Sequence, residues 1–233
     1  MRKIISYSLY GNNPRYSVNA IINAEICKEL YPDWQCVVYH DNSVPHKAIE
    51  KLKLLSNVIL LDMSNKPYQH FPTKHSPKMF WRFMAYENPE IDVVIFRDSD
   101  SFTSIRERDA VLQWIDSGKS IHLMRDHPHH RSKIMGGMWG LRKNNKVESL
   151  IAEFLKTEKQ AFDQYYLNLA IYPLFDDDRV VHDDSNYLGD KTHDWPTPKE
   201  HPEIFIGRTQ GPPDPSLFPE QAARHHQLIK ETS

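Results

Sequence analysis

The sequence predicts an α/β domain built on a doubly wound sheet, and three observations support this fold class. Short apolar runs rich in β-branched residues alternate with helical periodicity over the first 61 residues, in the order β-α-β-α-β that is typical of parallel strands joined by helices. A further run, 92–96, is continuously apolar, as in a strand buried on both faces. A chain of 233 residues suits one domain with a buried core, and no internal repeat or low-complexity linker divides it.

Strands and helices are predicted in turn along the first half of the chain. The β-rich apolar runs predict strands over residues 3–8, 36–39, 58–61 and 92–96. Apolar side chains at helical spacing predict helices over residues 16–31, 45–55 and 76–86. Pro32 ends the first helix, and Pro77 lies in the first turn of the third, where its missing N–H is tolerated. Ligands of such a sheet bind where its strands end.

The second half contains fewer clear signals. A helix predicted over 104–118 begins with Ser104 and Glu107 in the arrangement of a capping box. The other predicted elements are strands over residues 120–124 and 135–141 and helices over residues 147–156 and 161–169. From Tyr172 onward Pro, Asp and His replace the apolar runs, so we expect an irregular C-terminal part.

Composition and charge exclude several classes of protein. The 29 basic and 31 acidic residues give a net charge of −2, which argues against binding to nucleic-acid phosphates. No apolar run approaches the roughly 20 residues of a membrane span, and residues 1–10 lack the features of a signal peptide. Two cysteines cannot form a disulfide framework or a four-ligand zinc site. We therefore expect a cytoplasmic enzyme without a membrane span, for which peripheral contact with a membrane is possible.

The distribution of glycine is uneven. The chain has eight glycines, yet Gly136, Gly137 and Gly140 lie within five residues. Such a cluster indicates backbone that must approach another group closely. Space for packing Trp139 is the alternative explanation.

Two carboxylates follow the buried strand at 92–96. Asp98 and Asp100 are spaced i, i+2 where the strand ends, and a loop there can turn both towards one divalent cation. Hard cations such as Mn²⁺ or Mg²⁺ prefer oxygen ligands and retain positions for substrate phosphates. The pattern therefore favours a metal site, with an exposed acidic turn as the alternative.

The strand followed by Asp98-Ser99-Asp100 resembles the DxD motif of GT-A glycosyltransferases, which holds a metal against the diphosphate of a nucleotide sugar. Arg82 resembles an arginine that precedes this strand and contacts the donor in the glycogenin and lipopolysaccharide galactosyltransferase family, and its planar fork suits a diphosphate. The resemblance implies a single GT-A-like domain over 1–233, with a Rossmann-like N-terminal half and a mixed central sheet flanked by helices. It assigns 1–101 to nucleotide binding and 102–233 to the acceptor side.

The resemblance also implies which residues bind the nucleotide sugar. They are Ser8, Tyr10, Gly11, Asp41, Lys78, Arg82, Asp98, Ser99, Gly136 and Gly137. Tyr10 could stack on the base, and Asp41 could contact the base or ribose. The glycine pair falls where the family has its acceptor loop, although the Asn usual in that loop is absent.

Catalytic and metal-binding residues follow from the same resemblance. Asp126 is similar in position to an aspartate lining the donor-sugar pocket, and Asp163-Gln164 resemble an Asp-Gln pair beside the reacting sugar. Asp126 or Asp163 would stabilise the oxocarbenium-like sugar or activate the acceptor. The implied metal ligands are Asp98, Asp100 and His182, the last from the C-terminal part.

These features predict a metal-dependent hexosyltransferase. It would move a sugar from a nucleoside diphosphate sugar, with UDP favoured, to a carbohydrate or other hydroxyl acceptor in glycan, capsule or lipopolysaccharide synthesis. Inversion and retention both stay open. Asp98 could instead be the nucleophile of a haloacid-dehalogenase-type phosphatase, although that family begins with its motif. A non-catalytic nucleotide-sugar-binding module is the third hypothesis.

Overall fold

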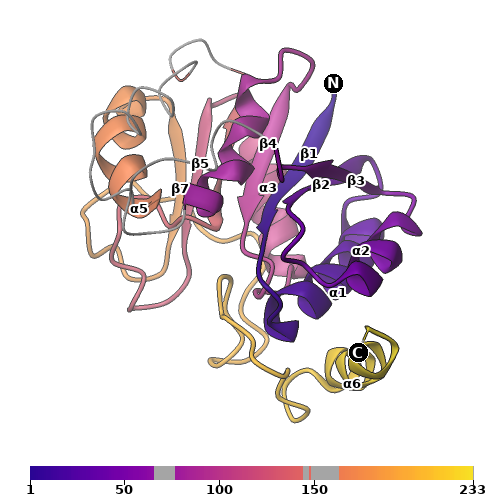
Figure 1. The fold of residues 1–233 in the computed structure, drawn as a ribbon. Helices are drawn as coiled ribbons and strands as arrows, with labels where there is room; N and C mark the ends of the chain where they lie inside the picture. The colour runs from indigo at the N-terminus through magenta and orange to yellow at the C-terminus, as the bar shows by residue number, and fades with distance from the viewer. Residues whose placement is uncertain (66–76, 144–146, 148–162, 233) are drawn as a thin grey trace.

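A seven-stranded sheet runs through the computed structural model, which describes residues 1–65, 77–143, 147 and 163–232 (Figure 1). The strands are ordered β3-β2-β1-β4-β6-β5-β7. Each neighbouring pair is parallel except the two made by β6, which is antiparallel to β4 and to β5. The predicted α/β fold with a mixed sheet and flanking helices is confirmed.

The strands are β1 (Lys3–Leu9), β2 (Trp34–His40), β3 (Val58–Asp62), β4 (Val93–Arg97), β5 (Ile121–Arg125), β6 (Met138–Arg142) and β7 (Arg179–Asp183). In the part of the chain that the structure describes, the α-helices are α1 (Pro14–Leu30), α2 (His46–Lys53), α3 (Ile105–Ser117), α5 (Asp163–Tyr166) and α6 (Pro219–Thr232). The other helical segments are the 3₁₀ helices η2 (Pro77–Glu87) and η5 (Tyr172–Phe175) and the π-helical η4 (Leu167–Ile171).

Helices cover both faces of the sheet, and β4 contributes to a core on each. Val93 and Ile95 belong to the cluster under α1, α2, α3 and α6, while Val94 and Phe96 belong to the cluster under η2 and η4. This alternation follows from the two-residue period of a strand and explains why the run at 92–96 is continuously apolar. Figure 1 shows α6 beside α1, the helix it contacts.

The segment predicted as a helix over 76–86 is a 3₁₀ helix. Its three-residue period places one set of side chains in the core and another at the edge of the sheet. In a 3₁₀ helix residues i and i+3 lie on the same side. Phe80 and Phe83 therefore face the core together, with ring centroids 5.8 Å apart, whereas Met79 and Arg82 line a cavity. The three-residue period thus places the phenylalanines on the core side of the helix, and Met79 and Arg82 on the side that faces the cavity.

The C-terminal part differs from the sequence expectation. It contains β7 and α6, neither of which the sequence pattern predicts, and only residues 184–218 between them are irregular. The helix predicted over 161–169 is a short α5 followed by the π-helical η4 within the described residues. The helix predicted over 147–156 lies almost wholly outside them.

The start of α3 confirms half of the predicted capping box. Ser104 caps the helix, because its side chain accepts a hydrogen bond from Glu107 N at 3.2 Å, and Gly118 ends it in the left-handed conformation. Glu107 does not reach back to Ser104. Its carboxylate instead accepts from Arg97 Nε at 2.6 Å, which ties the helix to the end of β4.

Candidate active site

A cavity of about 340 Å³ opens at the carboxyl ends of β1 and β4, where the fold class predicts ligands to bind. Its lining comes from the end of β1, the β1–α1 connection, the first turn of α1, η2, the loop after β4, the start of α5 and the C-terminal segment. The lining residues are Ser8, Tyr10, Arg15, Tyr16, Met79, Arg82, Asp98, Ser99, Asp100, Asp163 and Thr209. Two arginines and three aspartates therefore meet around one space.

Arg82 links two of these aspartates. One terminal nitrogen, Nη1, donates to Asp98 and, at 3.1 Å, to the carbonyl oxygen of Arg97; the other, Nη2, donates to Asp163 Oδ2 at 2.6 Å. Its backbone N donates to Ser8 Oγ at 2.9 Å. Burial alone would lower the pKa of Arg82, but the charges of Asp98 and Asp163 raise it above its ordinary value. A fixed, permanently charged guanidinium therefore lies beside the motif.

Backbone contacts hold the Asp98-Ser99-Asp100 turn in place. Asn23 Nδ2 donates to the Ser99 carbonyl at 2.9 Å, and Gln210 N donates to that of Asp100 at 2.6 Å. The Asp98 side chain is 43% exposed, whereas that of Asp100 is 7% exposed. Burial and the charge of Asp98 raise the pKa of Asp100, and this effect exceeds the opposing effect of its bonds to Arg15.

The two motif carboxylates suit a hard divalent cation. Within the described residues no three acidic, histidine or cysteine side chains converge as a metal-binding group. Asp98 and Asp100 would thus be the protein ligands from this part of the chain. Mg²⁺ is commonly held by one or two carboxylates, with water and substrate phosphates completing its octahedron, and Mn²⁺ also takes oxygen ligands. The donor set therefore fits the predicted cations.

His182 is not brought to these aspartates. It is fully buried on β7, with Nδ1 2.8 Å from His122 Nε2 and Nε2 2.6 Å from Gln113 Oε1. Both ring nitrogens are thus engaged inside the fold. The structure gives no support to the predicted third metal ligand, because this histidine serves the packing between α3, β5 and β7.

The glycine cluster divides into two parts with different neighbours. A Cβ on Gly136 would lie 2.5 Å from Asp163 Oδ2, and one on Gly137 would lie 2.8 Å from Asp98 N and overlap the Asp98 carboxylate. A Cβ on Gly140 would lie 2.8 Å from the ring of Trp114. The first two glycines therefore make room for the charged cluster, while Gly140 makes room for a core tryptophan other than Trp139.

Asp163 and Gln164 open α5 next to this cluster. The Asp163 side chain is 14% exposed and lines the cavity, and its Oδ1 accepts from Gln164 N at 2.8 Å. Gln164 is outside the cavity lining, and its Oε1 accepts from Ser132 Oγ at 3.0 Å. Only the aspartate of the predicted pair faces the cavity.

Asp126 lies outside the cavity, contrary to the expectation that it lines a sugar pocket. It is fully buried, 2.8 Å from Arg106 Nη2 and 3.3 Å from Lys199 Nζ, and it accepts from Ile206 N at 2.9 Å. Burial raises its pKa despite these cationic partners. With its oxygens occupied in this way, Asp126 fastens the C-terminal segment to α3 and β5.

The residues predicted to hold the nucleoside gather at the ends of β1 and β2. Tyr10 lines the cavity and packs edge-on against Trp81, while Lys78 Nζ is 2.6 Å from Asp41 Oδ2. Burial alone would raise the pKa of Asp41, but its bonds to Lys78 and Ser43 hold the pKa below the ordinary value. The carboxylate is therefore charged.

Gly11 follows Tyr10 in this group. It has a left-handed φ of 79°, and its N donates to Ser43 Oγ at 2.7 Å. Because Ser43 also bonds to Asp41, Gly11 connects the turn after β1 to the turn after β2. The four predicted residues thus lie together at the ends of β1 and β2, and Tyr10 is the one among them that lines the cavity.

Comparison with known proteins identifies the fold. No protein-family model matches the chain, and no curated protein matches it. Among solved structures, the galactosyltransferase LgtC, in complex with donor and acceptor sugar analogues, is similar with a TM-score of 0.58 at 16% identity, over 99% of this chain and 96% of LgtC. A glycosyltransferase involved in glycosylation of the PBCV-1 major capsid has a TM-score of 0.52 at 12% identity, over 99% and 100% of the two chains. The chain has the GT-A fold.

A third similar structure is longer than this chain. Residues 1–349 of TarS from S. aureus have a TM-score of 0.51 at 17% identity, over 79% of this chain. The chain spans 58% of that fragment. The TM-scores show a shared GT-A fold, and in this chain the Asp98-Ser99-Asp100 turn follows strand β4.

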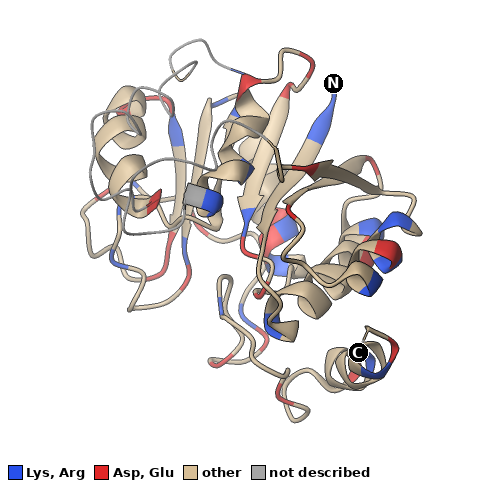
Figure 2. Ribbon diagram, in the orientation of Figure 1, with Lys and Arg blue, Asp and Glu red and all other residues tan. Residues whose placement is uncertain are grey.

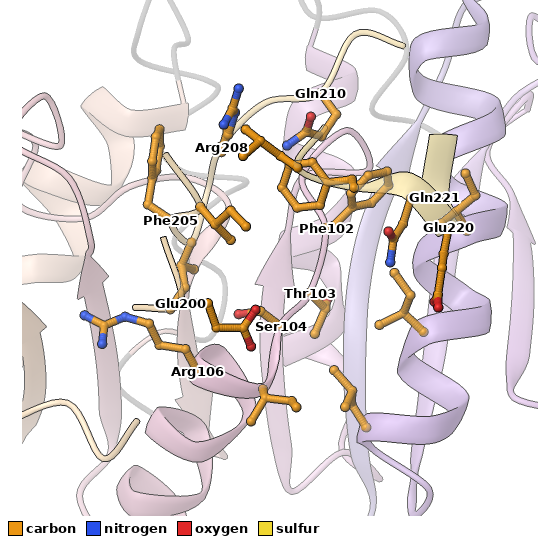
Figure 3. A pocket seen from close by; sticks show the side chains of 18 of the residues that line it. Phe102, Thr103, Ser104, Arg106, Glu200, Phe205, Arg208, Gln210, Glu220 and Gln221 are labelled. Carbon is orange, nitrogen blue, oxygen red and sulfur yellow. The ribbon is translucent and has the colours of Figure 1, made fainter. Parts of the chain in front are cut away.

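A second, larger cavity of about 450 Å³ lies between α1, the start of α3 and the C-terminal segment (Figure 3). Figure 3 shows Phe102, Phe205 and Glu200 around it, with Arg106 and Arg208 at one side. Its four basic side chains are already paired with acidic ones: Arg106 with Asp126, Lys199 with Asp184, Arg208 with Glu203 and Arg224 with Glu25. The motif aspartates line the smaller cavity, so that cavity is the candidate active site of this GT-A domain.

Sequence reasoning misses four residues of the cavity lining. They are Arg15, Tyr16, Met79 and Thr209. The first two lie in the first turn of α1, and a signal existed there, because ligands of an α/β sheet bind where the strands end and the next elements begin. No sequence signal indicated Thr209, because it reaches the site through an isolated β-bridge to Ser101.

Proposed function

We propose that the chain is a metal-dependent glycosyltransferase that moves a sugar from a nucleoside diphosphate sugar, with UDP favoured, to a hydroxyl acceptor in glycan, capsule or lipopolysaccharide synthesis. The observation that carries this proposal is the convergence of Asp98, Asp100, Arg82 and Asp163 on one cavity at the sheet edge of a GT-A fold. LgtC, which shares the fold, was solved with donor and acceptor sugar analogues, and this supports sugar transfer.

The charges around the cavity favour a donor that arrives with a cation. Three carboxylates and two guanidinium groups leave one negative charge. A diphosphate alone would be repelled by this surplus, whereas a diphosphate together with a divalent cation adds no net charge. Across the described residues acidic and basic side chains are interspersed, which suits recognition of a small anion better than of a polyanion (Figure 2).

The residues of the site have distinct proposed roles. Asp98 and Asp100 would hold the cation, which when bound supplies stabilisation for the charge developing on the diphosphate leaving group. Arg82 is fixed by its contacts with Asp98 and Asp163, so it offers a preorganised positive charge to the same group. Asp163 is the carboxylate that faces the cavity beyond the motif, and it would stabilise positive charge on the reacting sugar.

The remaining predicted residues would bind and orient the donor. Tyr10, with the Asp41–Lys78 pair beside it, offers a flat ring and fixed polar groups for the nucleoside. Gly136 and Gly137 let the Asp163 and Asp98 carboxylates lie close to the backbone, and so shape the place where the sugar and diphosphate would lie. Asp126 and His182 have no role in this proposal, because both are committed to partners inside the fold.

Thermal unfolding with nucleotides and nucleotide sugars, each with and without Mn²⁺, tests the proposal. A ligand that binds the folded state raises the unfolding temperature by mass action, so the donor class should produce a Mn²⁺-dependent increase. Asp100→Asn should lose this increase and the metal-dependent turnover of the donor. Asp33→Asn, at an exposed position before β2, should behave as the wild type.

Three results would contradict the proposal. Full metal-dependent transfer or hydrolysis by Asp100→Asn would remove the motif from the reaction. Metal-dependent binding with no turnover of any donor would instead favour a nucleotide-sugar-binding module, and trapping of an aspartyl-phosphate mimic on Asp98 would favour the phosphatase hypothesis.

A further inference from the structure

Arg15 makes a direct contact with the DxD turn. It is the second residue of α1, and its Nε and Nη2 lie 2.7 and 2.6 Å from the same oxygen, Oδ2, of Asp100. The backbone of Arg15 is fixed, since its N donates to the capping side chain of Asn13 at 3.0 Å. The guanidinium also lies over the ring of Tyr16, 5.5 Å from its centroid.

The two arginines of the cavity are held very differently. The Arg82 side chain is 6% exposed and bonds to two carboxylates and a backbone carbonyl. The Arg15 side chain is 36% exposed, and its hydrogen bonds to described residues go to Asp100 Oδ2 alone. Arg82 is therefore a fixed cation, whereas Arg15 can release one partner and take another without disturbing the core.

Asp100 needs a positive partner whether or not a donor is present. Its carboxylate is almost fully buried beside the charge of Asp98, a position in which an uncompensated negative charge is costly. Arg15 provides that partner in the structure. A divalent cation held by Asp98 and Asp100 would provide the positive charge instead. Because Arg15 contacts the same Asp100 carboxylate, the cation would also repel the Arg15 guanidinium.

We propose that Arg15 is a positioning residue that exchanges partners: it holds Asp100 when no cation is bound, and it turns to a phosphate oxygen of the donor when a divalent cation replaces it. This inference rests on the proposed function. It predicts that metal and arginine compete for Asp100 when the donor is absent and cooperate when the donor is present. A planar guanidinium is well suited to the second role because it binds phosphate through two parallel hydrogen bonds.

Binding of Mn²⁺ and UDP to wild type and Arg15→Gln tests this exchange without any measurement of turnover. Mn²⁺ affinity is measured by electron paramagnetic resonance of the free ion, and UDP affinity by calorimetry at saturating Mn²⁺. Arg15→Gln should bind Mn²⁺ alone about tenfold more tightly, since its competitor is gone, and UDP with Mn²⁺ about tenfold more weakly, since a phosphate contact is lost. Arg15→Lys should recover part of both changes.

The control is Arg2→Gln. Arg2 precedes β1, its side chain is 39% exposed, and it pairs with Glu90, so the substitution removes an equally exposed charge outside the site. It should leave both affinities unchanged. Wild-type affinity of Arg15→Gln for Mn²⁺ alone, or for UDP with Mn²⁺, would overturn the exchange while leaving the proposed function intact. Failure of the wild type to bind either ligand would overturn both.

Discussion

Gly137 shows at the scale of one residue why glycine is clustered in a chain that otherwise uses it sparingly. A Cβ there would overlap the Asp98 carboxylate and lie 2.8 Å from Asp98 N, so neither the side chain nor the backbone of the motif leaves room for one. Its φ is not in the left-handed region, so the requirement is space rather than conformation. The close approach predicted from the cluster is therefore an approach to the motif itself.

Gly137→Ala should consequently impair the site more than the fold. Because forcing a methyl group into a filled space costs roughly 1–3 kcal/mol, we expect binding of UDP with Mn²⁺ to weaken about tenfold or more. Calorimetry measures the affinity. Gly211→Ala is the matched control, since a Cβ at Gly211 meets nothing within 4 Å. Equal UDP affinity in the two variants would contradict this account of the glycine.

Single residues also show how far a sequence can locate a site. Asp98 was within reach of the pattern because it follows a buried strand, whereas Arg82 and Asp163 were assigned through the resemblance to a family. Asp126 and His182 carry the same chemistry in the sequence but have partners distant along the chain: Lys199 and Ile206 for the first, and His122 for the second. Local pattern cannot tell a carboxylate that faces a cavity from one that fastens two segments.

At the scale of elements, the strand order decides what meets at the cavity. The sequence predicts strands at β4, β5 and β6, but not that β6 inserts antiparallel between β4 and β5. This insertion pairs Arg97 with Met138 and so brings Gly137 against Asp98, and Gly136 against Asp163 and Arg82. The contacts of these glycines with charged side chains therefore arise from sheet topology, which apolar periodicity does not specify.

Strand β7 is hidden in the sequence for a related reason. Only two residues of Arg179–Asp183 are apolar, so the sequence pattern does not distinguish this strand from the polar segment around it. Buried pairing makes the strand possible: Asp183 Oδ2 is 2.6 Å from Arg125 Nε on the neighbouring strand, and His182 bonds to His122. Polar groups that satisfy one another across a sheet leave no apolar signature.

Helix α3 offers a test of how an element is fixed to the sheet. Ser104→Ala removes the cap and should lower the free energy of unfolding by about 1 kcal/mol. Glu107→Ala should lower it by about 3–5 kcal/mol, because it leaves the Arg97 guanidinium buried without its carboxylate. Urea denaturation measures both losses.

The control for α3 is Glu50→Ala, which breaks an exposed pair with Lys53 on α2 and should have the smallest effect of the three. If Glu107→Ala were no more destabilising than Ser104→Ala, the Arg97–Glu107 pair would not be what fixes α3 to the sheet.

For the molecule as a whole, buried polar pairs extend across the sheet and into the C-terminal segment. Arg106 contacts both Asp126 and Asp184, and Lys199 contacts the same two aspartates, so α3, β5 and the segment after β7 share one network. Because these paired groups are buried, the stability of the fold depends partly on their protonation.

None of the described helices combines the length and apolar character needed to cross a membrane.

The buried histidines give this dependence a defined direction. Burial, followed by the charges of His193 and Arg106, lowers the pKa of His182 to about 4, and burial also lowers the pKa of His122 well below its ordinary value. In the unfolded chain both would titrate near 6.5. Below about pH 6.5 the unfolded state therefore binds more protons than the folded state, and stability falls as the pH decreases towards the folded-state values.

We accordingly expect the free energy of unfolding of the wild type to decrease between about pH 6.5 and pH 4, with His182 alone accounting for about 3 kcal/mol of that decrease. His182→Gln removes this titration while keeping a side chain that can bond to His122 or Gln113, so its stability should depend less steeply on pH over the same interval. His46→Gln, at a side chain that is 85% exposed on α2, should follow the wild-type curve. Denaturation in urea at a series of pH values gives the three slopes. Parallel curves for His182→Gln and the wild type would mean that the buried histidine pair does not couple folding to protons, and the acid sensitivity would then belong to the carboxylates instead.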